Sequence, residues 1–191
     1  MLYSNYRPLS KVTLPPFQGR QMYMHTFNLT DPVMPRGFED YSIPVAILLL
    51  ASGAVEGFAH MTVDEKIVQA GMSQRKSRPH VDGCFVRAKK SWDHPGGNWL
   101  HTCNDIGRGP IARMPVIVVS SVSGCKAWRG EFDTEPKSDG DLSHLLLPQG
   151  ELLPANVGYL LSPDCVHESM VFQEPTQRTF LRIALPVEYK F

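Results

Sequence analysis

The 191-residue sequence lacks an excess of charge of either sign, because Lys plus Arg and Asp plus Glu both total 19. A chain without a net field carries no strong charge signal for nucleic acid or for an anionic membrane as a bulk partner. Long apolar runs are also missing. The longest, Ile43–Ala51, is about half as long as a membrane-spanning helix needs to be. We therefore expect no membrane partner.

The sequence also lacks closely spaced pairs of cysteines. The four cysteines (Cys84, Cys103, Cys125 and Cys165) include no C-x-x-C spacing of the kind that binds metals or marks a redox site. No segment at the N-terminus resembles a secretory signal. The pattern favours reduced thiols over a disulfide framework, and it predicts a cytoplasmic protein.

Prolines and glycines are plentiful, at 16 and 15, and they separate short apolar runs. This rhythm favours many strands joined by turns over a helical bundle. The predicted strands are Arg20–Asn28, Pro44–Leu50, Glu56–Thr62, Lys66–Ala70, His80–Ala88, Met114–Val119, Gly124–Phe132, Asn156–Leu161, Cys165–Phe172 and Arg178–Val187.

Two of these predictions rest on choices between alternatives. The apolar run Pro44–Leu50 fits a central strand or a short buried helix, and its length and the Ser-Gly that follows favour the strand. The polar triplet Val63-Asp64-Glu65 is interpreted as the turn of a hairpin. Together the strands predict one mainly β domain over residues 1–191, a double-stranded β-helix (jelly-roll or cupin-like barrel) with few peripheral helices.

Two stretches show no clear period. Residues 1–40 contain several prolines among aromatics and methionines, which predicts an irregular N-terminal arm packed over the core. Residues 89–110 combine glycines with two tryptophans and two histidines. Loops of this length in compact domains are often functional. We interpret 89–110 as an active-site lid, with Asn98 and Trp99 as candidate substrate contacts.

The triplet His80-Val81-Asp82 is the first candidate for chemistry. In an extended segment its outer side chains share one face, where an imidazole and a carboxylate can bind the same cation. His167 can supply a third ligand, because it follows a Ser-Pro-Asp turn and begins a predicted strand. Two histidines and one carboxylate on one face of a metal form the facial triad of non-haem Fe(II) oxygenases.

The last predicted strand has two unlike faces. Thr179, Leu181, Ile183, Leu185 and Val187 form a mostly apolar face, whereas Arg178, Phe180, Arg182 and Ala184 form the other. If the second face lines the interior, two guanidiniums are buried, which is costly unless a carboxylate meets them. The sequence offers no obvious paired acidic strand. A small dicarboxylate that accepts a bidentate fork is then the economical partner.

The ordered set His80-x-Asp82, His167 and an arginine on the last strand resembles the Fe(II)/2-oxoglutarate-dependent oxygenases, and the match covers His80–Ala184. The resemblance implies that His80, Asp82 and His167 ligate Fe(II), and that 2-oxoglutarate and O2 are co-substrates. It implies a dioxygenase of the hydroxylase type that releases succinate and CO2. It further implies that an arginine of the last strand holds the distal carboxylate of 2-oxoglutarate.

Which arginine does so stays open at this point. Arg178-Thr-Phe-Leu-Arg182 resembles the Arg-x-x-x-Arg of taurine-dioxygenase-like enzymes, in which the first arginine holds the co-substrate and the second meets an anionic substrate. Arg182-Ile-Ala-Leu instead resembles the Arg-x-Ser/Ala core found elsewhere in the superfamily. We favour Arg178.

A cupin-like barrel that binds a metal or small ligand without 2-oxoglutarate chemistry is the alternative from another class. The substrate is not defined by the sequence: a small molecule such as a free amino acid, a nucleobase or a protein side chain all fit. The basic stretch Arg75-Lys76-Ser77-Arg78 lies just before the His80 triplet. It is interpreted either as a solvated turn or as a segment that steers an anionic substrate.

Overall fold

The fold is that of a computed structural model, which describes residues 1–82, 114–137, 140–186 and 188–191. Of the described residues, 40% lie in strands and 9% in helices, so the prediction of a mainly β protein is confirmed. All of the strand pairs are antiparallel, and within the described ranges the sheets do not close into a barrel.

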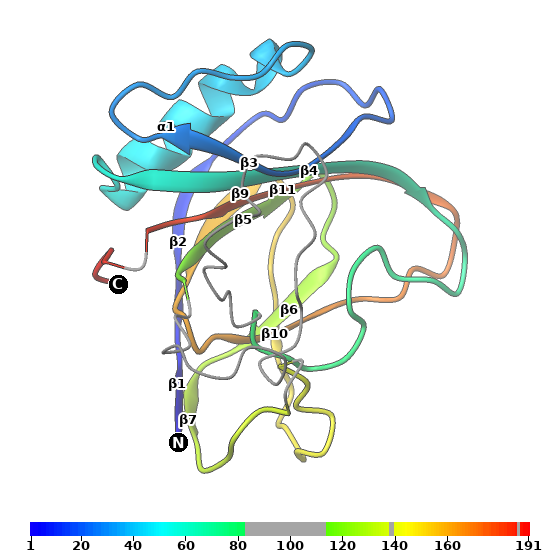
Figure 1. Ribbon diagram of the computed structural model, residues 1–191. Helices are drawn as coiled ribbons and strands as arrows, with labels where there is room; N and C mark the ends of the chain where they lie inside the picture. The colour runs from blue at the N-terminus through cyan, green and yellow to red at the C-terminus, as the bar shows by residue number, and fades with distance from the viewer. Residues whose placement is uncertain (83–113, 138–139, 187) are drawn as a thin grey trace.

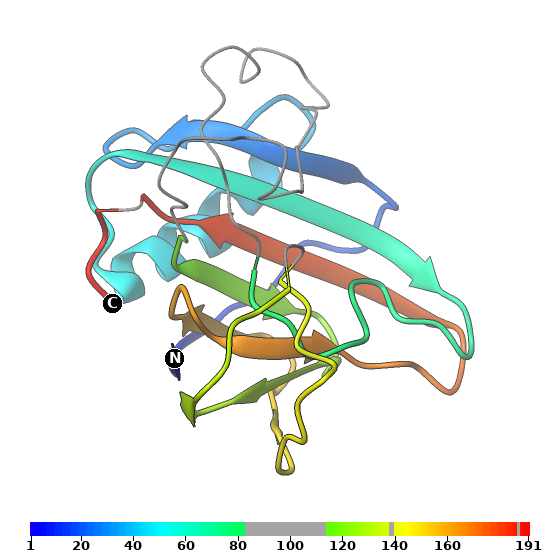
Figure 2. The same ribbon diagram turned by 60° about the horizontal axis from the view of Figure 1, so that its bottom comes forward.

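The largest element is a six-stranded sheet with the order β2-β9-β5-β11-β4-β3. Strand β11 lies near its middle. It pairs with β4 along its whole length on one side, and on the other side Phe180–Ala184 pair with β5. The sheet is the broad layer in Figures 1 and 2. Its strands are β2 (Tyr6–Lys11), β3 (Gln21–Asn28), β4 (Phe58–Val68), β5 (Val116–Ser120), β9 (Val157–Leu161) and β11 (Thr176–Ala184).

A smaller three-stranded sheet, in the order β10-β6-β8, lies across one face of the large sheet. Its strands are β6 (Cys125–Trp128), β8 (Glu151–Leu152) and β10 (Val166–Ser169). A further pair joins β1 (Leu2–Ser4) to β7 (Gly130–Phe132). The opposite face of the large sheet is covered by the helix α1 (Ser42–Ser52), which follows the short 3-10 turn η1 (Glu39–Tyr41).

The two faces of β11 belong to different apolar clusters, as its alternation predicts. Leu181 and Ile183 belong to an outer cluster beneath α1, which also includes Val45, Leu48, Met61, Val63 and Ile117. Phe180 and Ala184 belong to an inner cluster between the two sheets, which also includes Val116, Val118, Cys125, Ala127 and Tyr159. The two arginines of β11 therefore point toward the smaller sheet and are buried, with 1% of Arg178 and 7% of Arg182 exposed.

The prediction of a strand over Pro44–Leu50 is wrong, because this run forms the helix α1. Its buried residues (Pro44, Val45, Leu48, Leu49 and Ser52) recur at helical spacing, while Ile43 and Leu50 are exposed. The helix ends at Gly53, whose positive φ of 81° allows its N–H to bond the carbonyls of the last turn. Within the described ranges, no helix is long and apolar enough to cross a membrane.

The predicted hairpin turn at Val63-Asp64-Glu65 is also wrong, because Phe58–Val68 is one continuous strand, β4. Asp64 and Glu65 are 3% and 1% exposed, and they point to opposite faces of the sheet. Two adjacent acidic residues in mid-strand resemble a turn in sequence. Here each carboxylate meets polar groups that other elements provide.

The N-terminal segment contains the predicted strand at Arg20–Asn28, which is β3 (Gln21–Asn28), and it is otherwise more regular than expected. Residues 1–40 contain three strands, of which β2 and β3 form the two edges of the large sheet. Both edge strands have interrupted registers, β2 after Pro8 and β3 between Met22 and His25. These irregularities explain why the period-two pattern is hard to detect in this part of the sequence.

The segment between β2 and β3 is fixed to the large sheet by the carboxylate of Glu65. Glu65 accepts hydrogen bonds from the backbone N–H groups of Gln18 (2.6 Å) and Arg20 (3.0 Å). It also accepts one from the hydroxyl of Tyr41 (2.7 Å) and a charge-assisted pair from the guanidinium of Arg20, with the shorter bond at 2.9 Å. Arg20 continues to Asp40 beside α1. One buried carboxylate thus joins the N-terminal segment, the start of α1 and β4.

Replacing Glu65 by Gln keeps the shape of the side chain but removes the charge that Arg20 meets. Arg20 keeps its pair with Asp40, but the hydrogen bonds to residue 65 lose their charge assistance and the new amide NH2 faces other donors. We therefore expect the free energy of unfolding to fall by about 2 kcal/mol. Urea denaturation measures this as a lower midpoint with an unchanged m-value. The matched control is Glu135→Gln at an exposed pair with the N-terminal amine, where we expect a change below about 0.5 kcal/mol. An unchanged midpoint for E65Q would contradict this role.

The same carboxylate makes stability depend on pH. Burial alone would raise the pKa of Glu65, but hydrogen bonds from the Arg20 and Gln18 backbone and from Tyr41 and Arg20 side chains bring it below its ordinary value of 4.5. A depressed folded-state pKa stabilises the protein above that ordinary value, and the contribution is lost as the pH falls through the depressed pKa. Between pH 5 and pH 3, roughly the range of carboxyl titration, we expect the wild type to lose more stability than E65Q in parallel urea titrations.

Candidate metal centre

His80 and His167 are brought together by the main chain. They form an isolated antiparallel bridge in which the His80 N–H donates to the His167 carbonyl (3.0 Å) and the His167 N–H donates to the His80 carbonyl (2.9 Å). The two imidazole rings lie 4.4 Å apart between centroids. His167 is on β10, and His80 begins the predicted strand His80–Ala88. Of that strand only residues 80–82 are described, and residues 83–88 lie outside the described residues.

The segment that carries His80 is held from its other side as well. His80 also forms a bridge to Asp141, the Val81 N–H donates to the Gly140 carbonyl, and the Leu142 N–H donates to the Pro79 carbonyl. Gly140 has a positive φ of 83°, and a Cβ there would collide with the carbonyl oxygen of Val81. His80 is therefore fixed between β10 and the 140–142 segment.

Both imidazoles are oriented by backbone carbonyls two residues earlier in the chain. His80 Nδ1 is 2.7 Å from the Arg78 carbonyl oxygen, and His167 Nδ1 is 2.9 Å from the Cys165 carbonyl oxygen. Since a carbonyl oxygen only accepts, each Nδ1 carries the proton and each Nε2 presents its lone pair. A hydrogen bond of this kind on the second ring nitrogen is typical of metal-ligating histidines.

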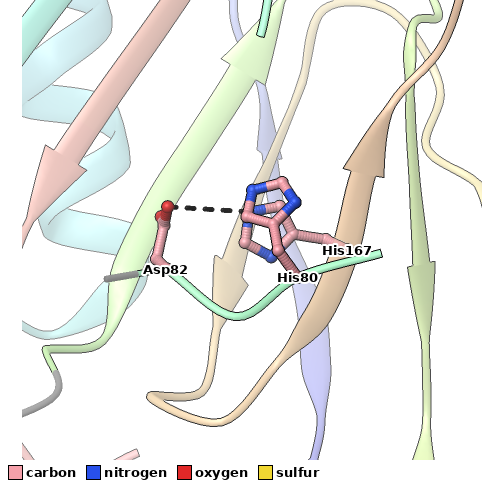
Figure 3. Close-up of side chains that lie close together, drawn as sticks. All are labelled: His80, Asp82 and His167. Carbon is pink, nitrogen blue, oxygen red and sulfur yellow. Dashed lines mark ion pairs between the residues drawn. The ribbon is translucent and has the colours of Figure 1, made fainter. Parts of the chain in front are cut away.

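Asp82 completes the group. Its Oδ1 is 3.8 Å from His167 Nε2, and one ligand atom from each of His80, Asp82 and His167 lies within 4.8 Å of the others. Figure 3 shows the two imidazoles side by side next to the Asp82 carboxylate, with the rings tilted at 52° to each other. The buried Oδ2 of Asp82 accepts no hydrogen bond from the described residues. Two imidazole nitrogens and a carboxylate can bind a divalent transition metal, and the residues present fit one.

The electrostatics suit a cation. Burial lowers the pKa of His80 to about 3, and the neighbouring His167 adds to this, so His80 is neutral at pH 7 and able to donate its lone pair. Burial alone would raise the pKa of Asp82, but the charges of Arg182 and the two histidines bring it well below its ordinary value. At neutral pH the centre therefore includes the neutral imidazole of His80 and the ionised carboxylate of Asp82.

Arg182 lies beside this centre. Its Nε is 3.3 Å from Asp82 Oδ2, and 8% of its side chain is exposed. Arg182 therefore meets a carboxylate of the chain itself, although the sequence shows no paired acidic strand and points to a small dicarboxylate as the partner of both arginines. Asp82 belongs to no acidic strand, and the sequence gives no sign that the two residues meet.

Arg178 has different surroundings. Its Nε donates to Ser120 Oγ (2.8 Å) and its Nη1 donates to Ser169 Oγ (3.0 Å). Its Cζ lies 5.7 Å and 5.4 Å from the ring centroids of Phe172 and Phe180. Among the described residues, none places a carboxylate within 4.0 Å of it. Burial lowers its pKa to about 10, so the guanidinium remains charged at neutral pH.

Some predicted site residues cannot be placed and some site residues were not predicted. Asn98, Trp99 and the whole predicted lid 89–110 lie outside the described residues. Ser120 and Ser169 were missed by the sequence interpretation. Ser169 stands two residues after His167 on the same face of β10, which is the one signal that marks it.

Comparisons of the chain with protein-family models, with curated proteins and with solved structures find no match.

Removal of a ligand tests the centre. We expect His80→Ala and His167→Ala each to weaken Mn(II) binding, followed through the EPR signal of the free ion, by at least about tenfold, since loss of an outer-shell partner alone has that effect. His144→Ala is the control, because this exposed histidine contacts Thr134 and is not part of the centre. Folded H80A and H167A proteins with wild-type affinity would show that the metal binds elsewhere.

Proposed function

We propose that this protein is an Fe(II)/2-oxoglutarate-dependent dioxygenase that hydroxylates its substrate. The observation that carries the proposal is the pairing of two sites on one inner face. Two histidines and a carboxylate converge, and a fully buried guanidinium, Arg178, lies near them without a carboxylate among the described residues. The first site calls for a metal and the second for an anion.

In this proposal His80, Asp82 and His167 hold the iron. The Nδ1 hydrogen bonds keep both histidines in the tautomer that binds a metal through Nε2. Three protein ligands leave positions for a co-substrate and for O2. Bound iron and 2-oxoglutarate supply the oxidative chemistry, in which O2 hydroxylates the substrate and 2-oxoglutarate becomes succinate and CO2.

Arg178 is the proposed anchor for the distal carboxylate of 2-oxoglutarate. Its Nη1 donates to Ser169, which is two residues beyond His167 on β10. Ser169 therefore lies roughly 7 Å along the strand from the proposed ligand His167. An extended five-carbon diacid can span such a separation. The Ser120 and Ser169 hydroxyls hold the guanidinium in place and are themselves able to donate to a carboxylate.

Arg182 fits this task less well, because Asp82 already meets its charge. We propose that Arg182 positions Asp82 as a ligand. A buried cation beside the carboxylate keeps Asp82 ionised and limits its rotation, whereas Arg178 has no carboxylate partner among the described residues.

The surroundings support oxidative chemistry through exclusion of water. The inner cluster provides Val118 opposite Arg182 in the sheet register, and Phe180 between the two arginines. We propose that the two sheets are the layers of a double-stranded β-helix, with the centre between them at its open end. A cupin-like barrel that binds metal alone would leave the charge of Arg178 unmatched, which favours the oxygenase.

The decisive measurement is anaerobic addition of Fe(II) and 2-oxoglutarate. We expect the visible metal-to-ligand charge-transfer band of the chelate in the wild type. We expect Asp82→Asn, which keeps the shape of the side chain, to weaken metal binding and the band. Absence of the band from folded, iron-loaded wild-type protein would refute the proposal.

Two lysine variants separate the roles of the arginines. Arg178→Lys keeps a charge but loses the fork, so we expect the Kd for 2-oxoglutarate, from titration of the band, to rise at least about tenfold with metal affinity unchanged. Arg182→Lys is the matched control in the same strand, and its main effect should be on metal affinity. The reverse pattern would assign the co-substrate to Arg182. Circular dichroism confirms that each variant is folded.

A further inference from the structure

We propose that Arg75 binds an anionic group of the primary substrate, so that the substrate is a small molecule carrying a carboxylate, a sulfonate or a phosphate. This inference rests on the proposed function for the position of the reaction, and it adds the chemical class of the substrate. Arg75 lies in the segment between β4 and His80, outside the last strand.

The Phe180 ring places Arg75 beside the inner face of β11, which carries Arg178 and Arg182. Arg75 Cζ is 5.7 Å from the centroid of this ring, and Arg178 Cζ is 5.4 Å from the same centroid. Phe180 lies on β11 between Arg178 and Arg182 and shares their face of the sheet. The ring is thus contacted by the proposed co-substrate anchor and by a third guanidinium from a separate part of the chain.

Arg75 is held loosely by the protein. Its one carboxylate contact among the described residues is Asp64 Oδ2 at 4.0 Å, the outer limit for an ion pair. The other oxygen of Asp64 accepts a hydrogen bond from Gln21 (3.0 Å). The side chain of Arg75 is 35% exposed, against 4% for Asp64. A partly exposed pair at this distance contributes little stability, so the guanidinium can bind a ligand at small cost.

The charge balance around Phe180 calls for an anion. Arg75, Arg178 and Arg182 provide three positive charges, and among the described residues Asp64 and Asp82 meet two of them. A divalent metal and doubly charged 2-oxoglutarate cancel each other. One positive charge is left over, which a singly charged substrate neutralises.

The charge of Arg75 also affects the two arginines of β11. Burial is the main reason that the pKa values of Arg178 and Arg182 are lowered, and Arg75 adds to the lowering in both cases. Two of these like charges, Arg75 and Arg178, lie over the same Phe180 ring, and their mutual repulsion destabilises the folded protein. A bound anionic ligand offsets this repulsion.

The test compares a charged probe with its neutral isostere. Benzenesulfonate and methyl phenyl sulfone are titrated by calorimetry into protein loaded with Mn(II), with and without 2-oxoglutarate and without O2. We expect the wild type to prefer the sulfonate, and Arg75→Gln to weaken sulfonate binding at least about tenfold. Binding of the sulfone and of 2-oxoglutarate should be unchanged.

The control is Arg129→Gln. Arg129 also lies over an aromatic ring, that of Tyr6, and near a carboxylate, Glu151 at 3.5 Å. We expect wild-type binding from this variant. Equal binding of sulfonate and sulfone by the wild type, or equal weakening of both by R75Q, overturns the proposal. Loss of 2-oxoglutarate binding in R75Q also overturns it, since Arg75 is then a co-substrate anchor.

The two proposals fail in different ways. If wild-type protein binds Mn(II) but not 2-oxoglutarate, the oxygenase function is refuted. The titrations with Mn(II) alone then still decide whether Arg75 binds an anion, because they do not require the co-substrate.

Discussion

The reciprocal backbone hydrogen bonds between His80 and His167 are the constraint on which the candidate site depends. They join β10, on the smaller sheet, to the segment that follows β4 of the large sheet. Both residues of the bridge carry an imidazole, and Asp82 follows His80 by two residues. The metal ligands are therefore positioned by strand pairing, and the geometry of the centre inherits the rigidity of a sheet.

The sequence predicted those parts of the protein that depend on local periodicity. The alternation of arginines and apolar residues on the last strand identified the inner and outer faces of β11. Sequence patterns do not distinguish helix from strand in the all-apolar run that forms α1, because such a run has no period. Pro44 in the first turn and Gly53 at the end are the two signals that favour a helix. Asp64 and Glu65 were taken for a turn because their partners are remote in sequence.

In the candidate site, too, the sequence predicts the local features and does not predict the long-range contacts. The motif placed His80 and Asp82 on one face, but their meeting with His167 depends on a register between distant segments that local pattern does not contain. The contacts that separate the two arginines, Ser120 and Ser169 for Arg178 and Asp82 for Arg182, are likewise long-range. The large sheet thus buries charge on both faces. Glu65 is satisfied by the chain itself on the outer face, whereas Arg178 on the inner face lacks a carboxylate among the described residues.

The two carbonyls that orient the ligand histidines have a consequence for how such a site can change over time. Many metal centres depend on a surrounding set of side chains, each of which a single substitution can remove. Here Arg78 and Cys165 contribute main-chain oxygens, which every amino acid possesses. The side chains at these two positions can therefore change in size, polarity and charge while both imidazoles keep their orientation.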